Sequence, residues 1–183
     1  MTLNALAIAD VKVFTPRVFS DDRGYFLETW GEAAFSKAGI AAHFVQDNHA
    51  SSVKAGTVRG LHFQNPPHAQ GKLVRVVRGS ILDVAVDIRR ASPTYGQHVS
   101  AVLTADNKKQ IWVPIGFAHG YVTLEPGTEV VYKVTHGYAP TAEGGILWND
   151  PALGIDWHLQ GRAPVLSEKD LILKPLDGTA HGF

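Results

Sequence analysis

The stretch Val58–Ile88 restricts the fold of this chain more than any other, because it holds three apolar runs separated only by short turns. The runs are Val58–Phe63, Lys72–Val77 and Ile81–Ile88. In the last of them large apolar residues alternate with aspartate and alanine, which is the period of a β-strand with two different faces. Three consecutive strands are therefore predicted for this part of the chain.

The predicted strands contain polar residues that an apolar core does not readily accept. These residues are Arg59, His62, Lys72, Arg75 and Asp83. Removing an unpaired polar group from water costs a few kcal/mol, and removing an unpaired charge costs more. Each of these side chains must therefore face solvent, pair with another group or line a cavity.

The length and composition indicate a single domain over residues 1–183, with a core of its own. The 17 basic and 17 acidic residues balance, so no basic excess indicates a nucleic acid or an anionic membrane as partner. The sequence contains no cysteine, which excludes disulfides, a thiolate nucleophile and a cysteine-based metal site.

The N-terminal segment MTLNALAIADVKVF lacks the basic region and the long apolar run of a signal peptide, and a strand is predicted there instead. No run in the sequence reaches the roughly 18 apolar residues that a membrane-spanning helix needs. We therefore expect a soluble, cytoplasmic protein.

The rest of the chain consists mainly of short strand-like runs between turns that contain Gly and Pro. One helix is predicted at Glu32–Ala38, closed by Gly39, and a turn of helix at Asp170–Leu173. Many short strands at near-regular spacing indicate an all-β sandwich or barrel. The predicted fold is an all-β jelly roll with a few short helices, whose open mouth would hold a small ligand.

Two hairpins are predicted in the second half of the chain. Val99–Leu103 and Gln110–Val113 flank a polar connection, and Ala118–Leu124 and Val130–Thr135 flank a turn with Pro and Gly. Short apolar runs joined by such turns are typical of antiparallel neighbours. We therefore expect each of these two pairs to share a sheet as direct partners.

Missing motifs argue against a nicotinamide- or ATP-dependent enzyme. The segment Gln70–Leu73 lacks the glycine spacing and the Ser or Thr of a P-loop, and no G-x-G-x-x-G follows a predicted strand. The G-x-S-x-G turn of α/β-hydrolases does not occur either.

The segment Pro114–His119 matches the P-x-G-x-x-H of the second cupin motif, and the chain resembles that superfamily here. The usual first motif contributes two histidines and a glutamate as metal ligands, whereas Leu61–Gln64 holds His62 alone. A metal site needs three or four converging ligands. Because His62 and His119 are the two plausible imidazole ligands, a metal-free cupin-type jelly roll is the favoured interpretation.

Eight segments spread over nearly the whole length of the chain can be compared with known families. They are DDRGYFLETW (Asp21–Trp30), FVQDN (Phe44–Asn48), VRGLHFQ (Val58–Gln64), QGKLVRVVRGSILDVAVDIR (Gln70–Arg89), WVPIGFAHGY (Trp112–Tyr121), VYKVTHGYAP (Val131–Pro140), ILWNDP (Ile146–Pro151) and LSEKD (Leu166–Asp170). In these segments the chain resembles the dTDP-4-dehydrorhamnose 3,5-epimerases, and eight segments in the right order make the resemblance specific.

The resemblance implies a cofactor-independent epimerisation in dTDP-L-rhamnose biosynthesis. The substrate is a dTDP-linked 4-keto-6-deoxyglucose, in which C3 and C5 both lie alpha to the C4 ketone. A base removes a proton from one face, an enolate forms, and an acid returns a proton to the other face. No redox change occurs, so no cofactor and no metal are expected.

The resemblance also assigns catalytic roles. His62 is the expected base, oriented by Asp170, and Asp83 is a rival for that partnership; Tyr132 is the expected acid, and Lys72 is expected to stabilise the C4 oxyanion. By residue chemistry alone each has an ordinary structural interpretation: a hydrogen-bonded histidine, a helix-start carboxylate, a packed strand tyrosine and a solvated lysine.

Further residues are expected to bind the substrate, since they match positions of the family's motifs. Arginine suits phosphate because its guanidinium matches two oxygens at once. The implied contacts are Arg23, Arg59 and Lys169 for the diphosphate; Glu28, Gln46, Asp47, Asn48 and Glu143 for the thymine, deoxyribose or sugar; Tyr138 and Phe26 beside the thymine ring; and His119 in the pocket wall.

The family resemblance implies a homodimer that exchanges N-terminal strands, so that Arg23, Phe26 and Glu28 enter the neighbouring subunit's site. Three alternatives stay open. The enzyme could invert C3 only or C5 only for another deoxysugar, the chain could be a non-enzymatic ligand-binding cupin, or it could be a metal-dependent cupin enzyme.

Overall fold

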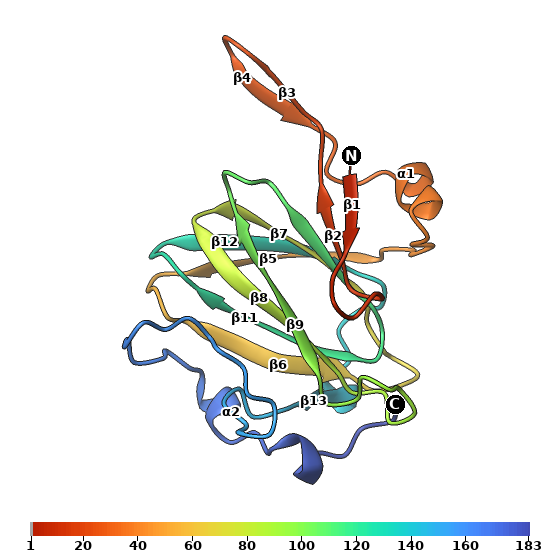
Figure 1. Ribbon diagram of the computed structural model, residues 1–183, viewed down its shortest axis with the longest axis vertical. Coiled ribbons are helices and arrows are strands. Elements are labelled where there is room, and N and C mark those ends of the chain that lie inside the picture. The colour runs from red at the N-terminus through yellow and green to blue at the C-terminus, as the bar shows by residue number, and fades with distance from the viewer. Residues whose placement is uncertain (1) are drawn as a thin grey trace.

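Two antiparallel sheets, packed face to face, form the body of the molecule in the computed structural model, which describes residues 2–183 (Figure 1). The six-stranded sheet has the order β1 (Thr2–Ala5), β2 (Lys12–Thr15), β10 (Gln110–Val113), β7 (Lys72–Arg78), β12 (Thr128–Val134) and β5 (Gln46–Ser52). The five-stranded sheet has the order β13 (Glu143–Gly145), β6 (Val58–Gln64), β11 (Phe117–Thr123), β8 (Ser80–Asp87) and β9 (His98–Thr104). The predicted all-β jelly roll is confirmed.

Strand β8 shows why the polar residues of the central stretch can be accommodated. All of its residues are buried, and its two faces alternate as predicted. Leu82 and Val84 pack on the outer side of their sheet, whereas Ile81 and Ala85 belong to the cluster between the sheets. The inner face of the five-stranded sheet is therefore the one that receives Asp83.

Both predicted hairpins are wrong, although their strands exist. β9 pairs with β8, and β10 pairs with β2 and β7; β11 pairs with β6 and β8, and β12 pairs with β5 and β7. The connections after Thr104 and after Thr123 each cross from one sheet to the other. Alternation identifies a strand and its buried face, but a turn that joins two sheets contains the same residue types as a turn within one.

The helices are short. The predicted helix is confirmed as α1 (Glu32–Lys37), and Gly39 follows it with φ +78°, a conformation that glycine adopts most easily. The predicted turn at Asp170–Leu173 begins two residues earlier, as α2 (Glu168–Leu171), because Ser167 caps it. Two 3₁₀ helices complete the set, η1 (Pro140–Ala142) and η2 (Leu176–Gly178).

A separate two-stranded hairpin, β3 (Val18–Asp21) with β4 (Gly24–Leu27), extends beyond the two-sheet body (Figure 1). Its large side chains are mostly in solvent: Tyr25 is 62% exposed and Phe26 70%. An isolated hairpin of this length is marginally stable in water and leaves its apolar side chains without a partner.

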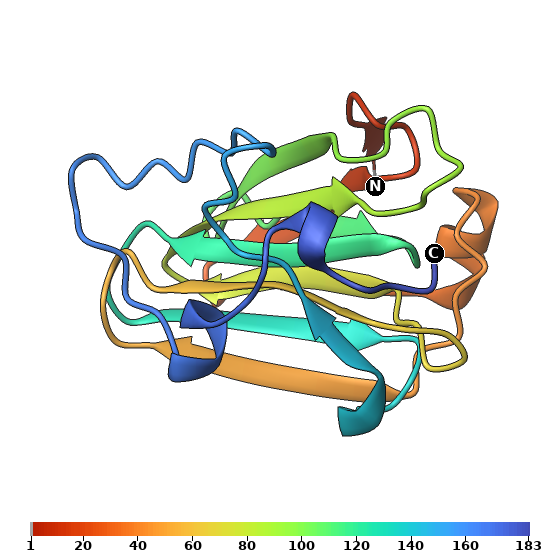
Figure 2. The same cartoon turned by 90° about the horizontal axis from the view of Figure 1, so that it is seen from below.

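The C-terminal segment runs across the outer face of the five-stranded sheet, where Figure 2 shows it in blue. Leu153, Trp157 and Leu176 pack there on the apolar residues of β8. Two isolated parallel bridges, Thr57 with Val165 and Ile146 with Lys174, hold the segment on both sides of α2. This places α2 against β6. Over residues 2–183 the structure contains no helix of the length and apolarity needed to cross a bilayer.

Candidate active site

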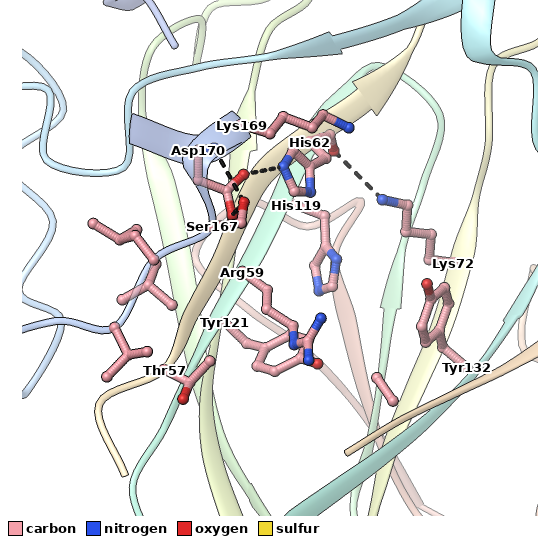
Figure 3. Close-up of a pocket in the computed structure, with 14 residues that line it drawn as sticks. Thr57, Arg59, His62, Lys72, His119, Tyr121, Tyr132, Ser167, Lys169 and Asp170 are labelled. Carbon is pink, nitrogen blue, oxygen red and sulfur yellow. Dashed lines mark hydrogen bonds and ion pairs between the residues drawn. The ribbon is translucent and has the colours of Figure 1, made fainter. Parts of the chain in front are cut away.

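A cavity of about 350 Å³ lies between the two sheets, and side chains from both sheets and from α2 line it (Figure 3). β6 and β11 supply one wall, while Lys72 on β7 and Tyr132 on β12 supply the other. A second lobe of about 290 Å³ shares His62, Lys72 and Tyr132 with the first. Three of the five polar residues that stood out in the predicted strands, Arg59, His62 and Lys72, therefore line this hollow. Asp83 is buried behind it, and Arg75 lines a different depression of the surface.

His62 and Asp170 form a hydrogen-bonded pair in the cavity wall. His62 Nε2 lies 2.5 Å from Asp170 Oδ1, although the two residues are 108 positions apart in the chain. Burial would raise the pKa of Asp170, which is 3% exposed, but hydrogen bonds from His62 and Ser167 and the charge of His62 outweigh it and lower the pKa. The carboxylate is therefore ionised at neutral pH and orients the imidazole.

Asp83, the rival partner, bonds a different histidine. His119 Nε2 lies 2.9 Å from Asp83 Oδ2, and both side chains are buried. The register explains this choice. His119 lies opposite His62 on β6 and opposite Ala85 on β8, so Asp83 is its diagonal neighbour. β6 and β8 are two strand spacings apart, roughly 10 Å, so Asp83 is too far from His62 to bond it.

Lys72 places a cation beside the His62–Asp170 pair. Its Nζ donates to the backbone carbonyl oxygen of His62 across 3.4 Å. Burial lowers the pKa of Lys72 to about 8, and the charges of Asp83 and Glu143 oppose that shift. The ammonium form still predominates at pH 7, so the cavity holds a positive charge that is poorly solvated and available to a developing anion.

Tyr132 completes the set of four predicted catalytic residues in this cavity. In Figure 3 Tyr132 and Lys72 lie on one side of the hollow, and Asp170 and Ser167 on the other. Burial raises the pKa of Tyr132, and the positive charge of Arg59 opposes the shift. The phenol therefore keeps its proton at neutral pH and can act as a donor.

The second lobe collects several of the residues predicted to bind substrate. Gln46 donates to Asn48 across 2.8 Å, and both line the lobe. Tyr138 donates its hydroxyl to Glu143 across 2.9 Å, and Glu143 also forms an ion pair with Lys169. This arrangement presents amide, phenol and carboxylate groups at the entrance, the kinds of group that recognise a nucleoside.

Other predicted contacts lie in the first lobe or outside the cavity. His119, Arg59 and Lys169 line the first lobe. Asp47, by contrast, points to the opposite face of β5 from its two neighbours and bonds Lys133 across 2.8 Å. The period of two along a strand requires this once Gln46 and Asn48 face the cavity, so the structure does not bring Asp47 to the site.

Arg23, Phe26 and Glu28 lie on or just after the protruding hairpin, away from this cavity in their own chain. Arg23 is at the tip of the hairpin, where it bonds Asp21 across 2.5 Å. The structure of a single chain therefore does not bring these three residues to the cavity.

Tyr121 and Ser167 are among the lining residues that the sequence analysis did not single out. Tyr121 lies two positions after His119 on the same face of β11, and among residues 2–183 its buried hydroxyl has no hydrogen-bond partner. Ser167 bonds Asp170, and its spacing of three residues before that acidic residue is the pattern of a helix N-cap. Strand alternation and the capping pattern were the signals that could have identified them.

Metal binding finds no ready-made site here. Within the described residues no group of three or more His, Cys, Asp or Glu side chains is placed to hold an ion. One ring nitrogen of His62 is hydrogen-bonded to Asp170, and one ring nitrogen of His119 is hydrogen-bonded to Asp83.

The comparisons with known proteins identify the family of this chain. The family model described as dTDP-4-dehydrorhamnose 3,5-epimerase matches residues 5–178. The enzyme of that name from Pseudomonas aeruginosa is 55% identical over 171 residues, which cover 93% of each chain. A crystal structure of dTDP-6-deoxy-D-glucose-3,5-epimerase from Legionella pneumophila, in complex with dTDP-4-keto-L-rhamnose, has a TM-score of 0.93 and 43% identity, and the match covers 97% of this chain and 93% of that one.

A more distant relative has a narrower activity. It is a 3'-monoepimerase from Streptomyces bikiniensis, solved with dTDP as a double mutant in which one histidine and one tyrosine are replaced by Asn and Phe. It has a TM-score of 0.88 and 31% identity, and the match covers 94% of this chain and 86% of that one. Taken together, the matched family model and the high identity over most of both chains show that this chain belongs to the dTDP-4-dehydrorhamnose 3,5-epimerase family, a family of isomerases.

Proposed function

We propose that this chain inverts C3 and C5 of dTDP-4-keto-6-deoxy-D-glucose to give dTDP-4-keto-L-rhamnose, without a cofactor, in dTDP-L-rhamnose biosynthesis. The observation that carries the proposal is the cavity in which the His62–Asp170 pair, Lys72 and Tyr132 meet. The family membership and the name of the 55% identical relative support the same reaction.

His62 is the proposed base. Its Nε2 faces Asp170 Oδ1 at 2.5 Å, and the ionised carboxylate can only accept, so the ring proton sits on Nε2. The lone pair is then on Nδ1, which takes the proton from the carbon next to the ketone. Asp170 stabilises the imidazolium that results. Imidazole suits both steps because it exchanges protons near neutral pH.

Lys72 is the proposed partner of the C4 oxygen. C3 and C5 flank the same ketone, so both deprotonations place negative charge on one oxygen, and one cation serves both. A fixed positive charge in a partly desolvated site stabilises that charge more than water does. The neighbouring backbone contact to His62 holds the ammonium beside the base.

Tyr132 is the proposed acid that returns the proton on the opposite face of the sugar. Its position on the wall facing Asp170 and Ser167 supports this role (Figure 3). The double mutant of the 3'-monoepimerase offers further support, since its replaced histidine and tyrosine are 70 positions apart, as His62 and Tyr132 are here.

The nucleotide is proposed to occupy the second lobe, where Gln46, Asn48, Tyr138 and Glu143 would hold it. We further propose that the chain is one domain and that two copies form a dimer by exchanging N-terminal strands. The exposed aromatic residues of the β3–β4 hairpin would then reach the partner's nucleotide, and Arg23 its diphosphate.

Incubation with the keto sugar nucleotide in heavy water tests the reaction. Deuterium at both C3 and C5 is the expected result, and His62→Asn should abolish it. A second candidate, inversion at one carbon alone, is favoured by the similarity to the 3'-monoepimerase, and uptake at a single carbon would establish it instead. Undiminished exchange in His62→Asn would show that His62 is not the base. No exchange in the wild type would favour a non-enzymatic ligand-binding protein.

A further inference from the structure

We propose that Ser167 is a positioning residue of this reaction: its hydroxyl locks the carboxylate of Asp170 in the orientation that the His62 ring needs. The inference rests on the proposed function, since it assumes that His62 is the base. Ser167 lines the cavity, and the hydrogen bonds of its hydroxyl go to Asp170, so it is proposed to act through that carboxylate.

The two carboxylate oxygens of Asp170 are held by two different donors. Ser167 Oγ donates to Oδ2 across 2.9 Å, while Oδ1 faces His62 Nε2 at 2.5 Å. The last side-chain torsion of aspartate has a broad energy minimum, so one hydrogen bond leaves the group free to twist. A second bond on the other oxygen fixes the plane of the carboxylate and with it the direction offered to the imidazole.

Ser167 is itself fixed relative to the strand that carries His62. Its Oγ accepts from the backbone N–H of Asp170 at 3.2 Å, so the hydroxyl donates to the carboxylate and accepts from the backbone of the same residue. Two positions earlier, Val165 accepts from the N–H of Val58 and donates to the carbonyl of Gly56, both across 2.9 Å. These bonds tie the serine to the start of β6.

A purely structural role for Ser167 is the competing explanation, because the residue is also the N-cap of α2. Capping and positioning make different demands. Glycine replaces serine at an N-cap with little loss, whereas alanine caps poorly. Neither glycine nor alanine can donate to the carboxylate. A pair of substitutions therefore separates the two roles.

The test compares Ser167→Ala, Ser167→Gly and Ser167→Thr in the full-length protein. If the hydroxyl positions Asp170, Ala and Gly should lower kcat alike, by about tenfold, because a hydrogen bond to a charged group is lost. KM should stay near the wild-type value, and Thr should restore most of kcat because it keeps the hydroxyl. A loss in Ala but not in Gly would assign the residue to capping alone and overturn the proposal.

A spectroscopic readout does not depend on turnover. In protein labelled with ¹⁵N-histidine, the signals missing from His62→Asn identify the ring of His62 among the nine histidines. Ser167→Ala and Ser167→Gly should shift the His62 Nε2–H resonance, and Ser167→Thr should return it. An unchanged resonance and unchanged kcat in Ala and Gly, with His62→Asn inactive, would overturn the role of Ser167 and leave the proposed function standing. A wild type without C3 or C5 exchange would instead remove the proposed function and this role with it.

Discussion

Burial acts in opposite directions on the two ionisable side chains that are proposed to face the His62–Asp170 pair. It lowers the pKa of Lys72 to about 8 and raises the pKa of Tyr132. Both shifts leave the group in the form that the reaction needs at neutral pH, an ammonium for the oxyanion and a protonated phenol for the carbanion. One desolvated cavity therefore prepares both groups.

The pKa of Lys72 predicts an alkaline limb in the rate. Below about pH 8 the side chain is an ammonium, and above it the charge is lost. Stabilisation of the C4 oxyanion should therefore disappear as the pH rises through 8, and kcat should fall. Lys72→Arg should be slower but should keep its activity to higher pH, because guanidinium stays charged. The measurement is kcat against pH for both proteins; coincident limbs would assign the titration to another group.

Replacing the proposed acid should separate proton removal from inversion. In Tyr132→Phe, His62 can still remove a proton and return a deuteron from the same side. Deuterium uptake with retained configuration should therefore persist in heavy water, while inverted product falls by about a hundredfold or more. NMR of the recovered sugar nucleotide measures both quantities.

Tyr121→Phe is the matched control for that experiment, since it removes a phenol from the same cavity. Burial raises the pKa of Tyr121 to about 12, so this phenol holds its proton firmly, and inversion should stay close to the wild-type rate. Equal losses in both variants would mean that the cavity's shape, rather than the proton of Tyr132, was being measured.

At the scale of elements, the three strands of Val58–Ile88 were predictable, but their partners were not. The N-terminal segment, expected to be one strand, holds β1 and β2 with a turn between them. Alternation located β8 and its two faces, because side-chain direction is a local property of the chain. Pairing depends on register between segments far apart, so neither the crossing from β11 to β12 nor the bond from Asp83 to His119 had a local signal. The outward direction of Asp47, in contrast, followed from alternation once one neighbour was placed.

The close approach of β6 to β11 gives a prediction at this scale. Gly60 has φ +128°, and a Cβ there would lie 2.5 Å from the Cα of Gly120 and 2.7 Å from the carbonyl oxygen of His119. Gly60→Ala should therefore force the two strands apart, lower the free energy of unfolding by about 3 kcal/mol, and displace His62. Urea unfolding at matched protein concentration measures the loss.

Gly24 offers a control with the same backbone strain. It also has φ +128°, but a Cβ there would meet no atom within 4 Å among the residues that the structure describes. Gly24→Ala should cost only the strain of the backbone, about 1 kcal/mol. If the two variants were equally destabilised, the clash between the added Cβ and β11 would not account for the loss of stability in Gly60→Ala.

At the scale of the whole molecule, the proposed catalytic residues and two of the residues expected to bind the nucleotide lie in different parts of the chain. The cavity holds the four proposed catalytic residues, but Arg23 and Phe26 project on a hairpin that its own chain leaves in solvent. The family resemblance assigned the catalytic residues and the hairpin residues to one site, but a single chain does not bring them together. A second copy that receives the hairpin would reconcile the two observations, since symmetric exchange completes both sites at once.

Hybrid dimers decide whether the hairpin serves the partner's site. One subunit carries His62→Asn and the other carries Arg23→Ala with Phe26→Ala, and two different affinity tags isolate the mixed dimer. If hairpins are exchanged, one of the two sites combines an intact His62 with an intact partner hairpin, so the hybrid should recover about half of the wild-type activity although each parent dimer is nearly inactive. A hybrid of His62→Asn with Tyr132→Phe should recover nothing, because each of its sites keeps one defect in the body. If each hairpin instead served its own cavity, the first hybrid would be as inactive as its parents, since the subunit with the intact base would lack its own hairpin residues.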